Sequence, residues 1–340
     1  MNIAGHDVTQ RILIVAEIGN NHEGSVARAE DMIALAREAG ADAVKFQTFK
    51  AERYVSRSDV GRFERLKRFE LSEQEFMRLR AAALKLGLIF LSTPFDADSA
   101  RFLNGIVPAF KIASGDNNHK PLLETIAAFG RPVILSTGLS DIAAVRKSRA
   151  IIERIWKDKG IRQSIAVLHC VASYPVPPAE ANLGAIVHLR QELGGIVGYS
   201  DHCMGIDAAV VSAALGARII EKHFTFDKNY SDYRDHQLSA NPGEFSEMSR
   251  RIRETECLIG NMTKTPQESE RSNERALRRS IVASRTIPCG SLIEMKDLDW
   301  IRPGTGIPPG EEFRILGKRT TRDYAAGELI DLESMGGAVG

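Results

Sequence analysis

Residues 198–224 read GYSDHCMGIDAAVVSAALGARIIEKHF, and this stretch decides the fold. Two short apolar segments each end in a polar cluster with a histidine, and an Ala-rich run with helical spacing connects them. If the segments are neighbouring parallel strands joined by a crossover helix, His202 and His223 lie side by side at the strands' carboxyl ends. Such a pair suits a divalent metal. A single histidine is as easily explained by a local hydrogen bond, so the rest of the chain must decide.

The same alternation of strand and helix continues through the preceding sequence. Apolar runs typical of buried strands occupy residues 12–18, 43–46, 88–91, 110–113, 133–135, 165–168, 196–199 and 219–222. Helical patterns occupy residues 26–38, 73–86, 121–129, 142–156, 183–192, 206–215 and 242–258. Eight such units predict an α/β fold, specifically a (β/α)₈ TIM barrel.

Polar residues occur near the same end of every predicted strand. Glu17 and Lys45 are examples, and a structural ion pair explains either one alone. A buried charge is costly unless it is paired or functional, so a whole ring of polar groups around one mouth is hard to explain by structure only. In TIM barrels this mouth holds the active site. The pattern therefore predicts an enzyme.

The pattern changes after Leu258. We predict a catalytic barrel over residues 1–260 and a solvated, charged linker with a short helix over residues 261–279. Residues 280–340 contain short β-type runs separated by turn signals, which predicts a small β-rich second domain. A domain of that size gains stability by docking onto another surface.

Composition excludes several classes of partner. The chain of 340 residues has 45 Lys and Arg against 44 Asp and Glu, so no global field attracts nucleic acid or an anionic membrane. The four cysteines show no CxxC spacing, and we find neither a signal peptide nor a long apolar span. We expect a cytoplasmic protein with free thiols.

The predicted ring of polar residues contains two sets of side chains that suit different chemistry. Two lysines and several hydroxyls form an anion site suited to a phosphate with or without a carboxylate: Lys45, Lys111, Ser92, Thr93, Ser114, Ser136 and Thr137. The metal-ligand and acid–base types are Glu17, His202, His223 and Asp235. A phosphorylated anion beside a Lewis acid suggests addition of an activated enol to a carbonyl. Spacing alone leaves an aldolase, a phosphatase or an isomerase equally open.

The motifs AEIGNNHEG, ADAVKFQTF, FLSTPFD, FKIASGDNN, ILSTG, HCVASYP, GYSDH and EKHFT, in this order, resemble the sialic acid synthase (nonulosonate synthase) family. The family includes N-acetylneuraminate synthases and SpsE-like spore-coat proteins. The tail segments LDWIRPGTGI and LGKRTTRDYAAGELI resemble its C-terminal antifreeze-like (SAF) domain. The resemblance covers almost the whole chain.

The resemblance implies condensation of phosphoenolpyruvate with an N-acyl hexosamine, of the N-acetylmannosamine type, to a nine-carbon keto acid and phosphate. Phosphoenolpyruvate would be held by Lys45, Thr93, Lys111, Ser114, Ser136 and Ser200. His202 and His223 would ligate Mn²⁺, or alternatively Mg²⁺ or Co²⁺. The residues that would face the sugar or relay protons are Glu17, Gln47, Asp116, Tyr174 and Asp235. Arg302 from the other subunit would reach the sugar's acyl group, which implies a domain-swapped homodimer.

The sequence departs from the family pattern at three places, and these departures concern the identity of the acceptor sugar. Ala172 stands where some N-acetylneuraminate synthases have Asn, Asp116 replaces the usual Glu, and residues 53–68 form a shorter segment than in several relatives. A legionaminic or pseudaminic acid synthase, or another phosphoenolpyruvate-dependent keto-sugar acid synthase, therefore stays open, as do the acceptor's phosphorylation, the native metal and the pathway. A non-catalytic sugar-binding protein would have lost central lysines or histidines, and none is lost.

Overall fold

The computed structural model describes residues 1–338. The chain divides into two compact units, Met1–Gly260 and Asn261–Gly340. Each unit has its own hydrophobic core.

The first unit is a parallel barrel, which confirms the predicted fold. Its strands are β3 (Leu13–Gly19), β4 (Ala43–Thr48), β5 (Ile89–Pro94), β6 (Phe110–Ile112), β7 (Val133–Ser136), β8 (Ile165–Cys170), β9 (Ile196–Asp201) and β10 (Ile219–His223). They pair in parallel in the order β5-β4-β3-β10-β9-β8-β7-β6, and the two end strands, β5 and β6, are in contact. Most strands extend beyond the predicted apolar runs into the polar residues at their carboxyl ends.

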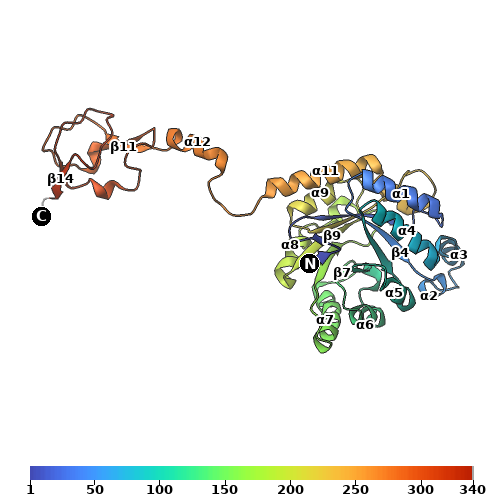
Figure 1. The fold of residues 1–340 in the computed structure, drawn as a ribbon. Helices are drawn as coiled ribbons and strands as arrows, with labels where there is room; N and C mark the ends of the chain where they lie inside the picture. The colour runs from blue at the N-terminus through green and yellow to red at the C-terminus, as the bar shows by residue number, and fades with distance from the viewer. Residues whose placement is uncertain (339–340) are drawn as a thin grey trace. The chain divides into compact units, whose positions relative to one another are not determined.

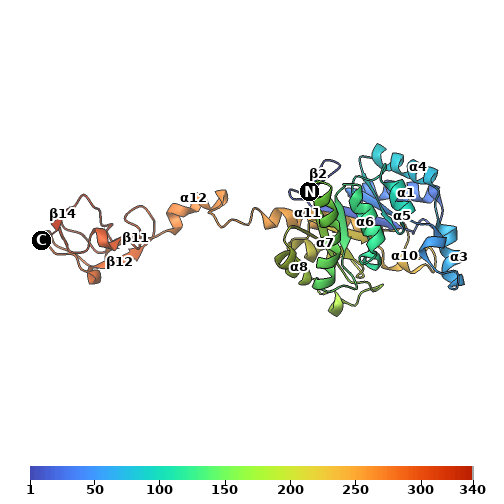
Figure 2. The ribbon, with the colours of Figure 1, turned by 90° about the horizontal axis from the view of Figure 1, so that it is seen from below.

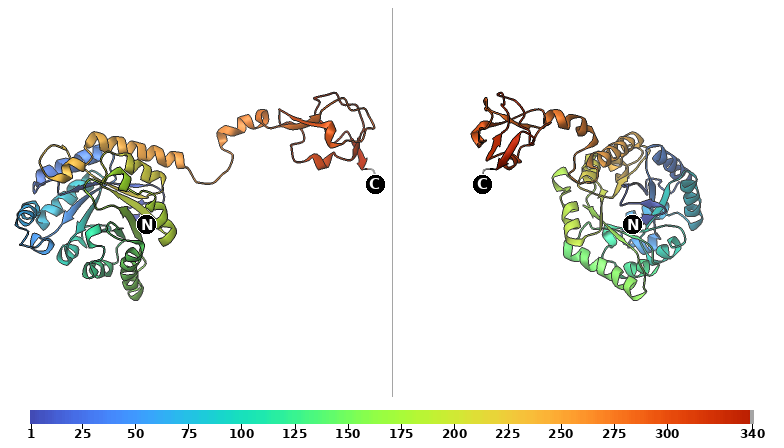
Figure 3. Two further views of the ribbon diagram at one scale, coloured as in Figure 1. Left: turned by 180° about the vertical axis from the view of Figure 1, so that it is seen from behind. Right: turned by 60° about the vertical axis from the view of Figure 1, so that its left-hand side comes forward.

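Helices surround the strands, as the right-hand view of Figure 3 shows. The crossover helices are α1 (Val26–Glu38), α4 (Glu73–Lys85), α5 (Ala97–Leu103), α6 (Lys120–Ala128), α7 (Ile142–Asp158), α8 (Ala185–Leu193), α9 (Asp207–Ala214) and α11 (Pro242–Ile259) (Figure 1). Shorter helices in the connections are α2 (Ala51–Tyr54), α3 (Val60–Phe69) and α10 (Arg234–Leu238). Capping boxes at Ser72 and Asn241 start α4 and α11, because each side chain accepts a backbone N–H that has no partner within the helix.

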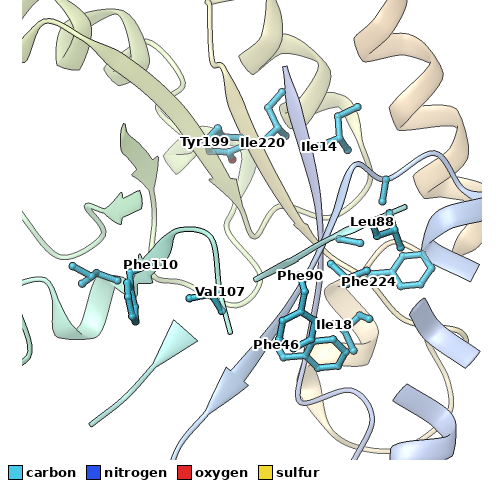
Figure 4. Close-up of a cluster of buried hydrophobic side chains, with 14 of the residues drawn as sticks. Ile14, Ile18, Phe46, Leu88, Phe90, Val107, Phe110, Tyr199, Ile220 and Phe224 are labelled. Carbon is cyan, nitrogen blue, oxygen red and sulfur yellow. The ribbon is translucent and has the colours of Figure 1, made fainter. Parts of the chain in front are cut away.

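The main core lies between the outer faces of the strands and the helices (Figure 4). Within it the rings of Phe46 and Phe90, on neighbouring strands, stack at 5.6 Å. A second layer fills the barrel interior below the polar ring. The N-terminal hairpin, β1 (Asn2–Ile3) and β2 (His6–Asp7), lies beside the end marked N in Figure 2. It closes the apolar layer, because Ile3 and Val8 pack against the strand residues of that layer. The polar ring therefore lies on top of an apolar layer inside the barrel.

The second unit begins with α12 (Glu268–Leu277), which has no buried side chain. Two antiparallel pairs follow, β11 (Ser280–Ala283) with β12 (Leu298–Ile301) and β13 (Lys318–Thr320) with β14 (Met335–Ala338). Their small core includes Ile281, Ile315 and Tyr324. Within residues 1–338 we find no helix that combines the length and the hydrophobicity needed to cross a bilayer.

Candidate active site

The site arises from the two-residue period of the strands. On β3 the inward positions are Leu13, Val15 and Glu17, and on β10 they are Ile219, Glu221 and His223. The first positions of each set belong to the apolar layer inside the barrel. The inward side chains then change from apolar to polar toward the carboxyl ends, as is typical of barrel strands that carry a site.

The polar ends enclose a cavity of about 970 Å³. Its lining includes thirteen of the predicted site residues: Glu17, Lys45, Gln47, Thr93, Lys111, Ser114, Asp116, Ser136, Tyr174, Ser200, His202, His223 and Asp235. Two hydroxyls predicted for the anion site, Ser92 and Thr137, do not line it, because Ser92 Oγ bonds to Thr48 Oγ1 at 2.7 Å and Thr137 Oγ1 donates to the Leu168 carbonyl oxygen at 2.9 Å. The structure thus brings together residues from all eight strands or the loops that follow them. A cavity of this size and position is typical of a ligand site.

The cavity floor is a network of buried charges. Lys45 Nζ lies 2.9 Å from Glu17 Oε2 and 3.7 Å from Glu221 Oε2, and Lys111 Nζ lies 3.4 Å from the same Glu221 oxygen. The four side chains are at most 5% exposed. Two lysines therefore face two carboxylates, so they are not free positive charges. Burial lowers the pKa of Lys111 although Glu221 opposes the shift, whereas at Lys45 the same effect of burial is outweighed by Glu17 and Glu221, which raise the pKa.

These four groups differ in how firmly they hold protons. Burial raises the pKa of the Glu17 carboxyl, even though Lys45 opposes the shift. Burial alone would also raise the pKa of Glu221, but Lys111 and Lys45 on either side hold it below its ordinary value. Glu17 is therefore the more basic carboxylate of the two.

His202 and His223 lie at the ends of adjacent strands, as the spacing predicted. Their ring centroids are 5.4 Å apart. Nδ1 of His202 lies 2.8 Å from the Val171 carbonyl oxygen, so this nitrogen carries the hydrogen and Nε2 keeps its lone pair. Nδ1 of His223 is buried without a hydrogen-bond partner. Burial lowers the pKa of both imidazoles to about 3, so both are neutral.

Two neutral imidazoles at this separation fit one divalent ion between them, given metal–nitrogen bonds of about 2.1 Å. Among residues 1–338 no cluster of three or more His, Cys, Asp or Glu side chains is arranged to hold a metal. The protein would therefore supply two ligands and leave the remaining positions to substrate and water, as catalytic metal sites do.

A buried ion pair behind the barrel wall anchors this histidine pair. Lys222 Nζ lies 2.9 Å from Asp201 Oδ2, and both side chains are 0% exposed. Tyr199 and the backbone N–H of Cys203 donate to the other Asp201 oxygen. Asp201 precedes His202, and Lys222 precedes His223, so the pair ties the two strand ends together at the residues next to the imidazoles.

The outer wall near the histidines is aromatic and acidic. The Tyr174 ring lies 4.1 Å from the His202 ring, with the Arg234 guanidinium 4.8 Å above it. Tyr233 donates to Asp235 Oδ2 at 3.0 Å. Burial raises the pKa of Asp235, which makes this carboxyl a second group able to exchange a proton.

Several buried polar atoms on the cavity-lining residues form no hydrogen bond, and two of them lie at the floor. Ser136 Oγ and Glu221 Oε1 are buried and form no hydrogen bond. Native proteins satisfy nearly all buried polar atoms, so such atoms need an explanation. A polar ligand in the cavity would satisfy both atoms, because it would supply the hydrogen-bond donors and acceptors that they lack within the protein.

Sequence reasoning missed some of the lining residues. Glu221 is the main one, since it neutralises both lysines. The two-residue period would have found it, because Glu221 precedes His223 by two on the same strand. Cys170, which stands in the motif HCVASYP but was given no role, and two arginines of α3 also line the cavity.

Arg302 lies in the second unit. It is exposed, and its Nε donates to the Leu277 backbone carbonyl at 2.9 Å. Its predicted contact with a sugar stays a prediction.

The sequence matches two family models, the NeuB family over residues 32–264 and the SAF domain over residues 278–334. An uncharacterized protein of Methanocaldococcus jannaschii is 44% identical over 93% of this chain and 92% of its own length. The N,N'-diacetyllegionaminic acid synthase of Campylobacter jejuni is 36% identical over 94% of this chain and 99% of that protein. A crystal structure of the N-acetylneuraminic acid synthetase of Leptospira borgpetersenii superimposes with a TM-score of 0.72 at 34% identity, covering 77% of this chain and 90% of that one.

Proposed function

This chain belongs to the NeuB family, and on that premise we propose that it condenses phosphoenolpyruvate with an N-acyl hexosamine to give a nine-carbon keto-sugar acid and inorganic phosphate. The observation that carries the proposal is the single cavity that joins the lysine and hydroxyl floor to the histidine pair. It places an anion site and a site for a Lewis acid within one enclosed space. A sialic acid of the N-acetylneuraminate type is the favoured product, and a legionaminic or pseudaminic acid is the alternative.

Phosphoenolpyruvate would occupy the floor. Lys45 and Lys111 offset its charge, while Ser114, Ser136 and Ser200 offer hydroxyl donors to its phosphate and carboxylate oxygens. Lys45 already donates to Thr93 Oγ1 at 3.3 Å, which orients its ammonium group. The partnerless Ser136 hydroxyl supports this placement.

The acceptor would lie above the floor with its aldehyde toward His202 and His223. A divalent ion held by these two residues, Mn²⁺ in our proposal and Mg²⁺ or Co²⁺ as alternatives, would supply Lewis acidity at the aldehyde oxygen. The side chains around it, including Gln47, Asp116 and Tyr174, would position the sugar.

The reaction forms a carbon–carbon bond and a carbon–oxygen bond and breaks the C2–O bond to phosphate. C3 of phosphoenolpyruvate bonds to the aldehyde carbon, and the aldehyde oxygen takes up a proton. Water adds at C2 and loses a proton; the C2–O bond to phosphate then breaks as the remaining hydroxyl becomes the ketone, and its proton leaves with the phosphate. Glu17 and Asp235, whose pKa values burial raises, are placed to give and accept these protons.

The direct test is inorganic phosphate release from phosphoenolpyruvate across a panel of N-acyl hexosamines, with the product identified by mass spectrometry. We expect release only when both substrates are present. Phosphate release without sugar, or no release with any sugar, would contradict the proposal.

Lys111→Met is expected to weaken phosphoenolpyruvate binding about 10- to 100-fold, because a lost charge-assisted hydrogen bond costs roughly 1.5–3 kcal/mol. Steady-state kinetics against phosphoenolpyruvate measure the effect, and circular dichroism checks the fold. Lys120→Met, an exposed lysine at the start of α6, is the matched control and keeps wild-type kinetics. Unchanged kinetics for Lys111→Met would place the phosphate elsewhere.

We further propose a homodimer in which Arg302 serves the partner's cavity. An Arg302→Ala protein mixed with a Lys111→Ala protein should then regain part of its activity, because a hybrid dimer combines one intact barrel with one intact Arg302. Pull-down through a tag on one variant shows whether subunits exchange. Exchange without recovered activity would contradict the swapped arrangement.

A further inference from the structure

The motif GNNHEG, residues 19–24, contains a buried amide that the proposed reaction does not use. Asn21 is 0% exposed and is not among the residues that line the cavity. Its Nδ2 donates to the Phe224 carbonyl oxygen and to Ser239 Oγ, both at 2.9 Å. These partners follow Asn21 by 203 and 218 residues in the sequence, so only the fold brings them together. Both N–H groups of the amide are therefore used to hold one distant segment.

That segment is the loop over residues 224–240, which connects β10 to α11. The two partners of Asn21 lie at its ends, so the amide joins the beginning of the loop to its end. A backbone hydrogen bond closes the same place, because the Ala240 N–H donates to the His223 carbonyl oxygen at 2.8 Å. The loop thus leaves β10 and returns to it, and Asn21 fixes the point of return.

Ser239 extends this contact to the backbone of Asp235. Ser239 is 0% exposed as well, and its Oγ donates to the Asp235 backbone carbonyl oxygen at 2.5 Å. Helix α10, which carries Asp235, has only five residues, so most of its carbonyl groups have no partner N–H within the helix. The Ser239 hydroxyl, four residues further along, supplies a partner for one of them. Two side-chain hydrogen bonds therefore connect Asn21 through Ser239 to Asp235.

The Asp235 side chain lines the cavity, where it is proposed to exchange a proton. Tyr233 donates to one of its carboxylate oxygens at 3.0 Å, but both residues belong to the same loop, so this bond does not fix the loop to the barrel. Asn21 belongs to the β3–α1 connection, whose residues 20–22 are buried. The link through Ser239 therefore ties the position of the carboxyl group to the barrel.

We propose that Asn21 and Ser239 are positioning residues that act on the reaction through Asp235, an inference that rests on the proposed function. Neither of them lines the cavity, so neither touches a substrate there. Ser239 holds the backbone of Asp235, and Asn21 holds Ser239. Together they keep the carboxyl group at the distance at which it exchanges a proton with the acceptor, because a misplacement of about 1 Å can cost a factor of 10² in rate.

The first experiment compares two serine-to-alanine variants. Ser239→Ala should lower kcat about 10-fold and change KM for phosphoenolpyruvate by less than about 2-fold, because the proton exchange is disturbed and the anion site is not. Ser212→Ala is the matched control. Ser212 is also 0% exposed and its Oγ donates to the Ala209 backbone carbonyl oxygen at 2.6 Å, but it does not line the cavity. Both variants should lose about 2–4 °C in Tm, and only Ser239→Ala should lose kcat.

A double-mutant cycle shows whether Ser239 acts through Asp235. Asp235→Asn should lower kcat by about 10²- to 10⁴-fold, and adding Ser239→Ala should lower it by less than about 2-fold more. Asn21→Ser, which is too short to reach both partners, should follow the same pattern: a lower kcat in the wild-type background and little further loss in Asp235→Asn. Urea denaturation followed by circular dichroism checks that each variant is folded.

The outcomes separate the two proposals. Equal kcat values for Ser239→Ala and Ser212→Ala overturn the inference and leave the proposed function standing. A loss of about 10-fold that Ser239→Ala causes in the Asp235→Asn background as well has the same meaning, because the two residues would then act independently. If the wild-type protein releases no phosphate from phosphoenolpyruvate with any N-acyl hexosamine, the proposed function itself fails, and the inference fails with it.

Discussion

The His223→Ala variant is expected to lose turnover by about 10³-fold or more, together with its bound metal. His202 and His223 are the two imidazoles that lie side by side at the strand ends, and one of them alone would not hold the ion in place. Lewis-acid stabilisation supplies several kcal/mol, and each 1.4 kcal/mol or so corresponds to a factor of ten in rate. Chelation of the wild-type enzyme should have the same effect, and Mn²⁺ should restore activity to the chelated wild type but not to the variant.

Elemental analysis and calorimetric titration with Mn²⁺ test the metal apart from turnover. His169→Gln is the control, because His169 is another buried histidine on β8, with its Nε2 2.8 Å from the Ala181 carbonyl oxygen. This control should keep metal stoichiometry near that of the wild type. Full activity in metal-free protein, or an unaltered metal content in His223→Ala, would contradict the proposed metal site.

Lys222→Met is expected to destabilise the barrel by about 3–5 kcal/mol, the usual cost of leaving one partner of a buried ion pair uncompensated. Asp201 would remain inside the protein with 0% exposure and no cation beside it. Urea denaturation followed by far-ultraviolet circular dichroism measures the free energy of unfolding.

Lys228→Met provides a comparison with a partly exposed pair. Lys228 lies 2.9 Å from Glu244, but the side chains are 23% and 36% exposed, so we expect a loss of about 1 kcal/mol or less. Adding Asp201→Asn to Lys222→Met should recover part of the lost stability, because it removes the buried charge. If Lys222→Met were as stable as Lys228→Met, Asp201 would not be a buried charge left without a partner, and the prediction would be wrong.

The positions of the site residues were largely predictable from the sequence. Buried strands alternating with amphipathic helices predict the barrel, and parallel strands place all their carboxyl ends at one mouth. The polar residue after each apolar run is therefore enough to assemble Lys45, Lys111, His202 and His223 in one cavity. The prediction succeeds because the hydrophobic period of a strand and that of a helix are both set by residues close together along the chain.

The charge balance of the site was decided only by the tertiary structure. Glu221 pairs with Lys45 and Lys111 across strands that are far apart in the sequence, and that contact depends on the register and closure of the barrel. The same closure buries Glu17, the histidines and Asp235, and so sets the direction of their pKa shifts.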